Sequence, residues 1–271
     1  MVFKRTKRLY PMYIIAITII FLITHIFNLP DRTVTFKQFI LNLFLLGGIP
    51  GVPYVDGSHW YLRTSLFLIV LFSVIQRLRE KIRIVSYYVV VIIIMISKAL
   101  YTCYDQIAIA KLIKAAYIFI GLDSFIVAFV GVGISLFLSN KRTSGAFLSL
   151  LCVVFDFFLF NLFHTVSIIA FSFLLILCLH NKIPFLEKKP FQVIAASSYS
   201  IYLIHQNLGF LILLLLIRFS DYQFWMGATT TIVVLLLGIG AFIFIETPLN
   251  IFIEIVLKRD VKQGDTKSNK V

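Results

Sequence analysis

Three polar side chains share one face of an otherwise apolar segment towards the C-terminal end of the chain. Ser198, Tyr202 and His205 follow one another at spacings of four and three residues, which places them on one side of a helix. A histidine inside a membrane helix either hydrogen-bonds to a neighbouring helix or lines a polar pocket in which it can exchange protons. The spacing leaves both interpretations open.

Other ionisable residues also fall within apolar segments. Inserting such a residue into a membrane costs about 2.5–3.5 kcal/mol, so it usually faces the interior of a helix bundle or water. Arg63 and Lys98 are close to the predicted outer surface of the membrane. Their side chains can therefore extend to that surface and need not face the interior of the bundle. The ionisable residues concerned are Arg63, Lys98, Asp123, Asp156, His205 and Glu246.

Motifs of the commoner soluble enzymes do not accompany these residues. The sequence contains no glycine-rich phosphate loop, no H-E-x-x-H pair and no G-x-S-x-G turn. The cysteines Cys103, Cys152 and Cys178 are far apart and form no C-x-x-C pair. We therefore predict neither a metal site nor a redox site.

The elements that must position the polar side chains are membrane helices. Of the 271 residues, 60% are hydrophobic and only 14% are charged, whereas about 25% are charged in soluble domains. This composition excludes a soluble enzyme and predicts an all-α, polytopic transmembrane helix bundle, since a spanning helix needs about 20 mainly apolar residues. Eight spans are predicted: Pro11–Leu29, Trp60–Gln76, Ile84–Tyr101, Ala116–Leu138, Gly145–Phe160, Thr165–His180, Ile194–Ile217 and Met226–Ile245.

The distribution of basic residues predicts the orientation of these helices. The net charge is +13, and 18 of the 25 Lys and Arg residues fall in alternate connections and in the two terminal segments. Cytoplasmic loops carry such an excess, so both termini are expected in the cytoplasm and no nucleic-acid partner is expected. We predict a transmembrane domain over residues 1–250, a polar cytoplasmic tail over 251–271, and an interfacial segment at Phe36–Leu46.

Four segments, in this order along the chain, resemble the acyltransferase-3 family of bacterial integral membrane acyltransferases, which includes O-acetyltransferases of surface polysaccharides. Residues 3–11 (FKRTKRLYP) are similar to the family's F-x-x-R-x-x-R-x-x-P segment. Residues 55–62 (VDGSHWYL) are similar to its loop-to-helix junction, and residues 198–205 (SYSIYLIH) to its S-Y-x-I-Y-L-x-H segment. Residues 246–248 (ETP) close the last helix in the same way.

The resemblance implies a function and a set of site residues. The protein would move an acyl group, with acetyl expected, from cytoplasmic acyl-CoA to a hydroxyl of a cell-envelope polysaccharide or glycolipid in the bacterial inner membrane. Arg5 and Arg8 would bind the phosphates of acyl-CoA, because guanidinium groups match phosphate oxygens; ordinary orientation charge is the alternative. No permanently bound cofactor is expected. The expected cavity-lining residues are Asp56, Trp60, Ser198, Tyr202 and His205, and the expected structural residue is Glu246.

The sequence departs from the family pattern in two places. Members usually open with a further helix pair, whose first helix carries an arginine and the histidine expected to act as general base. Met1 corresponds to the loop after that pair, so the histidine is expected upstream of Met1 and the chain alone is expected to be inactive. Arg63-Thr64-Ser65 also stands where many members carry an acidic residue. The alternative function is a non-catalytic scaffold or a glycan or lipid translocator.

Overall fold

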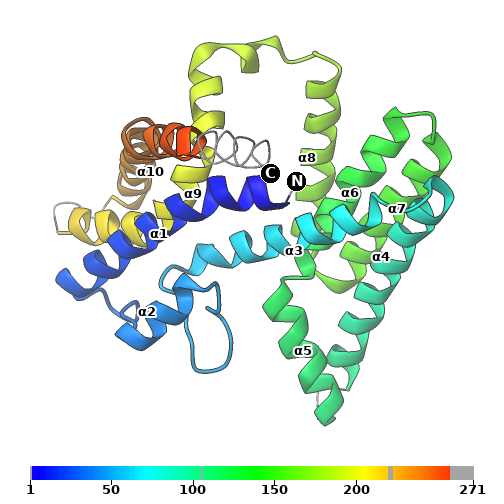
Figure 1. The fold of residues 1–271 in the computed structure, drawn as a ribbon, viewed down its shortest axis with the longest axis horizontal. Helices are drawn as coiled ribbons and strands as arrows, with labels where there is room; N and C mark the ends of the chain where they lie inside the picture. Colours follow the sequence, from blue (N-terminus) through cyan, green and yellow to red (C-terminus); the bar gives the residue numbers. More distant parts are fainter. Residues whose placement is uncertain (1, 105, 219–221, 257–271) are drawn as a thin grey trace, which may run out of the picture. The chain divides into compact units, whose positions relative to one another are not determined.

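The computed structural model describes residues 2–104, 106–218 and 222–256, with the backbone alone for residues 2–5 and 8. Every regular element within these residues is helical (Figure 1), which confirms the predicted all-α class. The elements are α1 (Val2–Ile26), α2 (Phe36–Leu43), η1 (Gly57–His59), α3 (Trp60–Ile75), α4 (Glu80–Cys103), α5 (Ala108–Ile120), α6 (Asp123–Leu138), α7 (Arg142–Leu159), α8 (Leu162–Leu179), η2 (Pro184–Glu187), α9 (Lys189–Leu216), α10 (Gln223–Ala241) and η3 (Phe242–Glu246).

The helices match the predicted membrane spans in number. Among the described residues, seven are long and apolar enough to cross a membrane, and one bent pair can raise that number to eight. The last span continues past its predicted end at Ile245, through the π-helical η3, to Val256. Most of the predicted tail over 251–271 lies outside the described residues. The helix α2 covers most of the predicted interfacial segment and begins with a capping box between Thr35 and Gln38.

One predicted span, Ala116–Leu138, is wrong in its geometry. The helix α5 ends at Ile120, and α6 begins at Asp123 at an angle of 58° to it. Gly121 caps α5 with a φ of +75°, a conformation that glycine adopts readily because it has no Cβ. The sequence contains no signal that distinguishes a capping glycine from a helical glycine within an apolar run. The apolar pattern therefore predicted one continuous helix.

The chain divides into two compact units, which we describe separately: unit 1 is Met1–Trp60 with Leu186–Val271, and unit 2 is Tyr61–Phe185. In unit 1, α9 packs against α10 and against α1 (Figure 1). The α9–α10 contact is close, because a Cβ at Gly238 would lie 2.8 Å from Cα of Ile201. Small residues allow such close packing of membrane helices, and it fixes α9 as the central helix of the unit.

Unit 2 is built around the antiparallel helices α6 and α7, with α4 and α8 packed beside them. Its core contains Val91, Phe129, Leu148 and Cys152, all fully buried. The backbones of α6 and α7 approach so closely at Gly145 that a Cβ there would lie 2.2 Å from the amide nitrogen of Phe137. This packing holds α7, and with it the buried Asp156 near its end, in a fixed position.

Candidate functional site

The second family-like segment, residues 55–62, begins as a loop that one aspartate organises. Asp56 precedes η1, and its Oδ1 accepts hydrogen bonds from the Ser58 amide at 2.9 Å and the Ser58 hydroxyl at 2.6 Å. This is the role of an N-cap residue, which satisfies backbone N–H groups at the start of a helix. Asp56 is fully buried, so its carboxylate depends on these donors for its solvation.

The same loop binds backbone groups of α9. The amide of Asn207 donates to Oδ2 of Asp56 at 3.1 Å, and Nε2 of His59 lies 3.1 Å from the carbonyl oxygen of Leu203. A carbonyl only accepts, so this ring nitrogen carries the hydrogen. Residues 203 and 207 are the two ends of one helical hydrogen bond. The loop thus contacts both ends of one helical turn, and we refer to Asp56, Ser58, His59 and Asn207 as the loop latch.

Further polar contacts surround the loop latch. The side-chain amide of Asn207 donates to the carbonyl of Val55 at 2.7 Å and accepts from Nη1 of Arg32 at 2.7 Å. The Tyr202 hydroxyl donates to the carbonyl oxygen of Ser58. A Cβ at Gly57 would lie 2.8 Å from Nε2 of Gln206, so the backbone of the loop also approaches this side chain of α9 closely.

The first and fourth family-like segments also meet α9. The Tyr199 hydroxyl donates to the carbonyl of Leu9 in α1 at 2.8 Å. The Ser200 hydroxyl donates to Oε2 of the buried Glu246 at 2.6 Å. Three family-like segments that are far apart in the sequence therefore meet the fourth, which is part of α9. Glu246 is buried, and its structural role stays a prediction.

The predicted cavity-lining residues divide into two groups. Asp56 and Tyr202 are brought together through Ser58. Ser198 and His205 are exposed, and Nδ1 of His205 lies 2.7 Å from the carbonyl oxygen of Tyr202 in its own helix. Trp60, at the start of α3, is 39% exposed. The cavity-lining role of these five residues stays a prediction.

The predicted donor-binding residues Arg5 and Arg8 lie within α1, three residues apart, but their side chains are outside the described part of the structure. A cavity of about 370 Å³ opens beside this segment. Its wall combines the first turns of α1 with the end of the last helix. The residues that line it are Thr6, Lys7, Tyr10, Pro11, Phe252, Ile253 and Val256.

The intramembrane charges of unit 2 are paired with polar or aromatic groups. Arg63 is buried, with its guanidinium carbon 4.0 Å from the centre of the Phe119 ring. Nζ of Lys98 bonds to Asp123 at 3.2 Å. Both arginine and lysine therefore have partners inside the unit, and the prediction that they extend to the surface is not needed to explain them.

Sequence reasoning missed several of the residues that make these contacts. Arg32 and Asn207 carried no local signal, and His59 appeared only as a member of the family-like segment 55–62, because the partners of all three are more than 140 residues away. His164, which bonds to Asp156, was also missed. Here a signal existed: an aspartate in the last turn of one helix and a histidine in the first turn of the next are close in an antiparallel hairpin.

The described helices that are long and apolar enough to cross a membrane indicate a multi-pass membrane protein. A family model described as "Acyltransferase domain" matches residues 1–247, which is most of the chain. The chain therefore belongs to the acyltransferase-3 family and is a membrane acyltransferase by family. No curated protein and no solved structure matches it.

Proposed function

We propose that the protein transfers an acetyl group from cytoplasmic acetyl-CoA to a hydroxyl of a cell-envelope polysaccharide or glycolipid at the bacterial cytoplasmic membrane. The observation that carries this proposal is the family match over residues 1–247. The contacts of the other three family-like segments with the one in α9 support it, because residues that act together must be held together.

The donor would bind at the N-terminal end of α1. Arg5 and Arg8 are spaced so that they occupy neighbouring positions on one side of the helix. Guanidinium groups bind phosphate oxygens in a bidentate manner, and coenzyme A carries several such oxygens. The mainly apolar cavity beside Thr6 and Tyr10 would accept an uncharged part of the donor.

The acceptor end of the site would be shaped by the loop before α3. Asp56 holds this loop on α9. Trp60 follows the loop directly, and the Tyr202 hydroxyl of α9 donates to it. An aromatic ring beside hydrogen-bonding groups suits a sugar, whose faces are apolar and whose edges carry hydroxyls. Asp56 would act by holding the loop, since its carboxylate is fully buried among its own donors.

The experiment measures transfer of radiolabelled acetyl groups from acetyl-CoA to envelope glycans in membranes that contain the full protein. We expect the double variant Arg5→Ala/Arg8→Ala to raise the KM for acetyl-CoA at least about tenfold, because each lost charged hydrogen bond contributes about 1.5–3 kcal/mol. The control is Lys141→Ala/Arg142→Ala, which removes two adjacent cations from another connection.

Two results would contradict the proposal. An unchanged KM for acetyl-CoA in Arg5→Ala/Arg8→Ala would remove these residues from the donor site. Absence of any acetyl transfer above membranes without the protein would argue against the activity itself and in favour of a scaffold or translocator.

A further inference from the structure

The connection between α3 and α4 in unit 2 is short and strongly basic. Arg77, Arg79 and Lys81 fall at alternate positions there, and all three are exposed. The acidic residue of this segment, Glu80, bonds to Nζ of Lys141 at 3.0 Å. The charge of Glu80 is therefore compensated by a residue of another connection.

The three cations have no partner of their own. Within the described residues, the side chains of Arg77, Arg79 and Lys81 take part in no hydrogen bond, ion pair or ring contact. The neighbouring Arg83 differs from them, since its Nη1 donates to Oε1 of Gln76 at 3.4 Å. The three cations are therefore available to an anionic ligand.

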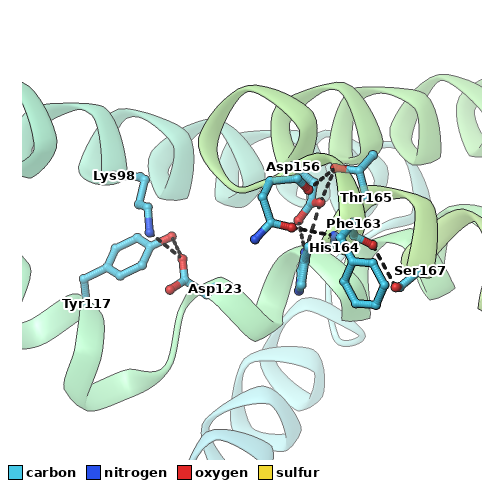
Figure 2. A network of polar contacts seen from close by, with 9 residues as sticks. Lys98, Tyr117, Asp123, Asp156, Phe163, His164, Thr165 and Ser167 are labelled. Atoms are coloured by element: carbon cyan, nitrogen blue, oxygen red, sulfur yellow. Dashed lines mark hydrogen bonds and ion pairs between the residues drawn. The ribbon is translucent and has the colours of Figure 1, made fainter.

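Charged groups near the other end of α4 are arranged differently. Nζ of Lys98 lies 3.2 Å from Oδ1 of Asp123, and the Tyr117 hydroxyl donates to the same oxygen at 2.8 Å (Figure 2). Asp156 and His164 form a second pair in the same view, at 2.8 Å. These charges satisfy one another, so they give no reason to expect an ionic ligand at that end.

The start of α4 adds a preference for negative charge. Its N-cap residue is Arg79, whose side chain makes no capping hydrogen bond. Most N-cap residues are Ser, Thr, Asp or Asn, because their oxygen accepts from an amide of the first turn that has no partner within the helix. Where no such oxygen is present, the first-turn amides and the helix dipole favour an anion.

Lys81 also lines a cavity of about 460 Å³ beside α4. From Lys81 the wall continues along one face of the helix through Val85 and Val89, at spacings of four residues. These two valines are 58% and 46% exposed. Lys81 and Ser86 are the polar residues of the wall, so the cavity is an apolar groove with an ammonium group at the end of the helix where α4 begins.

A cationic end and an apolar groove match the two parts of a phospholipid. Guanidinium and ammonium groups bind phosphate oxygens, and basic residues at a membrane surface attract anionic lipids. In the orientation that the basic residues predict, the connection lies at the cytoplasmic surface, where lipid phosphates are found. Val89 follows Lys81 by eight residues, or about 12 Å along the helix, which is a depth that a lipid chain occupies.

We propose that the α3–α4 connection and the groove beside α4 form a binding site for an anionic phospholipid, with its phosphate at Arg77, Arg79 and Lys81 and one hydrocarbon chain along Val85 and Val89. The site lies within unit 2 and does not depend on the proposed acyl transfer. The alternative is that the three cations only orient the helices, as an excess of cytoplasmic Lys and Arg does.

The first test compares two lipids on the wild-type protein. The full chain, purified in detergent, is titrated with phosphatidylglycerol, which carries a net negative charge, or with phosphatidylcholine, which carries none. Native mass spectrometry gives the Kd of each. We expect phosphatidylglycerol to bind at least about tenfold more tightly, since each basic residue near the lipid favours the anionic headgroup by about fivefold. Equal Kd values for the two lipids would contradict the proposal without any variant.

The second test removes the three cations together. Arg77→Gln/Arg79→Gln/Lys81→Gln should raise the Kd for phosphatidylglycerol by about 10- to 100-fold and leave that for phosphatidylcholine nearly unchanged. The three side chains are exposed, so the variant should fold, and its circular dichroism spectrum checks this.

The matched control is Lys182→Gln/Lys188→Gln/Lys189→Gln. It removes the same charge from exposed positions of another connection that is predicted on the same side of the membrane. The control should keep the wild-type Kd for phosphatidylglycerol within about twofold, since its cations lie outside the groove. Equal losses in the two triple variants would show a general attraction of basic loops to anionic lipid and would overturn the proposal.

The third test addresses the hydrocarbon chain. Val89 is partly exposed, so Val89→Trp extends into the groove. It should raise the Kd for phosphatidylglycerol at least about fivefold, because the chain loses its packing contacts there. The control Val166→Trp, at a valine of α8 that is 53% exposed, should not raise it.

The free headgroup separates a lipid site from a simple phosphate site. Glycerophosphoglycerol carries the same phosphate without chains, and at equal concentration it should not displace phosphatidylglycerol. Displacement by the free headgroup, or a wild-type Kd in Val89→Trp, would show that the cations bind phosphate without the groove, and the lipid assignment would be wrong.

Discussion

Two histidines in the two units are held in similar ways but left with very different surroundings. His59 in unit 1 bonds through Nε2 to the Leu203 carbonyl, and its Nδ1 is buried without a hydrogen-bond partner among the described residues. His164 in unit 2 bonds through Nδ1 to Asp156 and lines a cavity of about 380 Å³. The side chain of His164 is 44% exposed, whereas His59 is 2% exposed.

The comparison separates a fully buried set of polar contacts from a partly exposed one. In the loop latch, the buried carboxylate of Asp56 accepts from three donors, which replace the water that is absent inside a membrane. At the α7–α8 turn, the carboxylate of Asp156 is just as buried, but the histidine ring that bonds to it is partly exposed. The accessibility of the histidine, more than the presence of a bound partner, therefore distinguishes the two sites.

The largest effect on stability is expected from Asp56→Ala in the loop latch. It removes the acceptor of three hydrogen bonds, from the amide and hydroxyl of Ser58 and from the amide of Asn207. We expect the free energy of unfolding to fall by about 3–5 kcal/mol, since each bond to a charged group contributes about 1.5–3 kcal/mol and the three are not additive. Unfolding by SDS in mixed micelles, followed by circular dichroism, measures this change.

The exposed Glu187→Ala variant is the control for Asp56→Ala and should leave the unfolding midpoint unchanged. An equal midpoint for wild type and Asp56→Ala would mean that the loop latch contributes nothing to stability.

A smaller effect is expected at the second buried carboxylate of unit 1. Ser200→Ala removes the hydroxyl that donates to Glu246 at 2.6 Å, and both residues are buried. The free energy of unfolding should fall by about 1.5–3 kcal/mol, the usual contribution of a hydrogen bond to a charged group. The same SDS titration measures it, and combining Ser200→Ala with Glu246→Gln should restore part of the loss. A wild-type midpoint in Ser200→Ala would show that the bond is not needed.

Two glycines of α10 should respond in opposite directions. Gly238→Ala places a methyl group 2.8 Å from the backbone of Ile201 and should cost about 1–3 kcal/mol, as overpacking of a core does. Gly240→Ala meets no atom within 4 Å and should instead stabilise the helix, by up to about 1 kcal/mol. Thermal unfolding in detergent should therefore give midpoints on either side of the wild type. Two midpoints that move in the same direction would contradict the close α9–α10 packing.

The smallest effect is expected at the ion pair beside the α7–α8 turn. Lys98→Met removes the bond to Asp123, whose side chain is 44% exposed. Partly exposed ion pairs contribute about 0–1 kcal/mol, so the unfolding midpoint should move little. A loss as large as that of Asp56→Ala would show that unit 2 depends on its polar contacts as unit 1 does, and the comparison would fail.

The sequence predicts the helices well because each span is a long apolar run, and a membrane leaves few other structures for such a run. It fails at Gly121, since a left-handed glycine and a helical glycine look alike within an apolar segment. The family resemblance predicted that Asp56 and Tyr202 belong to one site. The bond between Asp56 and the backbone of Asn207 could not be predicted, because backbone groups have no sequence signature.

The contact of Asp156 with His164 is a different case. Both residues flank a connection of two residues between antiparallel helices, so the distance between them follows from the helix boundaries. A shift of the predicted start of this span from Thr165 to Leu162 brings His164 inside the helix. The boundary of the helix, and not its existence, decided whether the pair was found.

The central claim is tested most directly by one pair of matched variants, with unfolding by SDS followed by circular dichroism as the measurement. Asp56→Asn keeps the size of the side chain but removes the charge that accepts from Ser58 and Asn207 in a fully buried loop. His164→Asn can keep a donor for Asp156 at a side chain that is 44% exposed. We predict that Asp56→Asn lowers the free energy of unfolding by about 1–3 kcal/mol more than His164→Asn does. Equal losses for the two variants, or a larger loss in His164→Asn, would contradict the account.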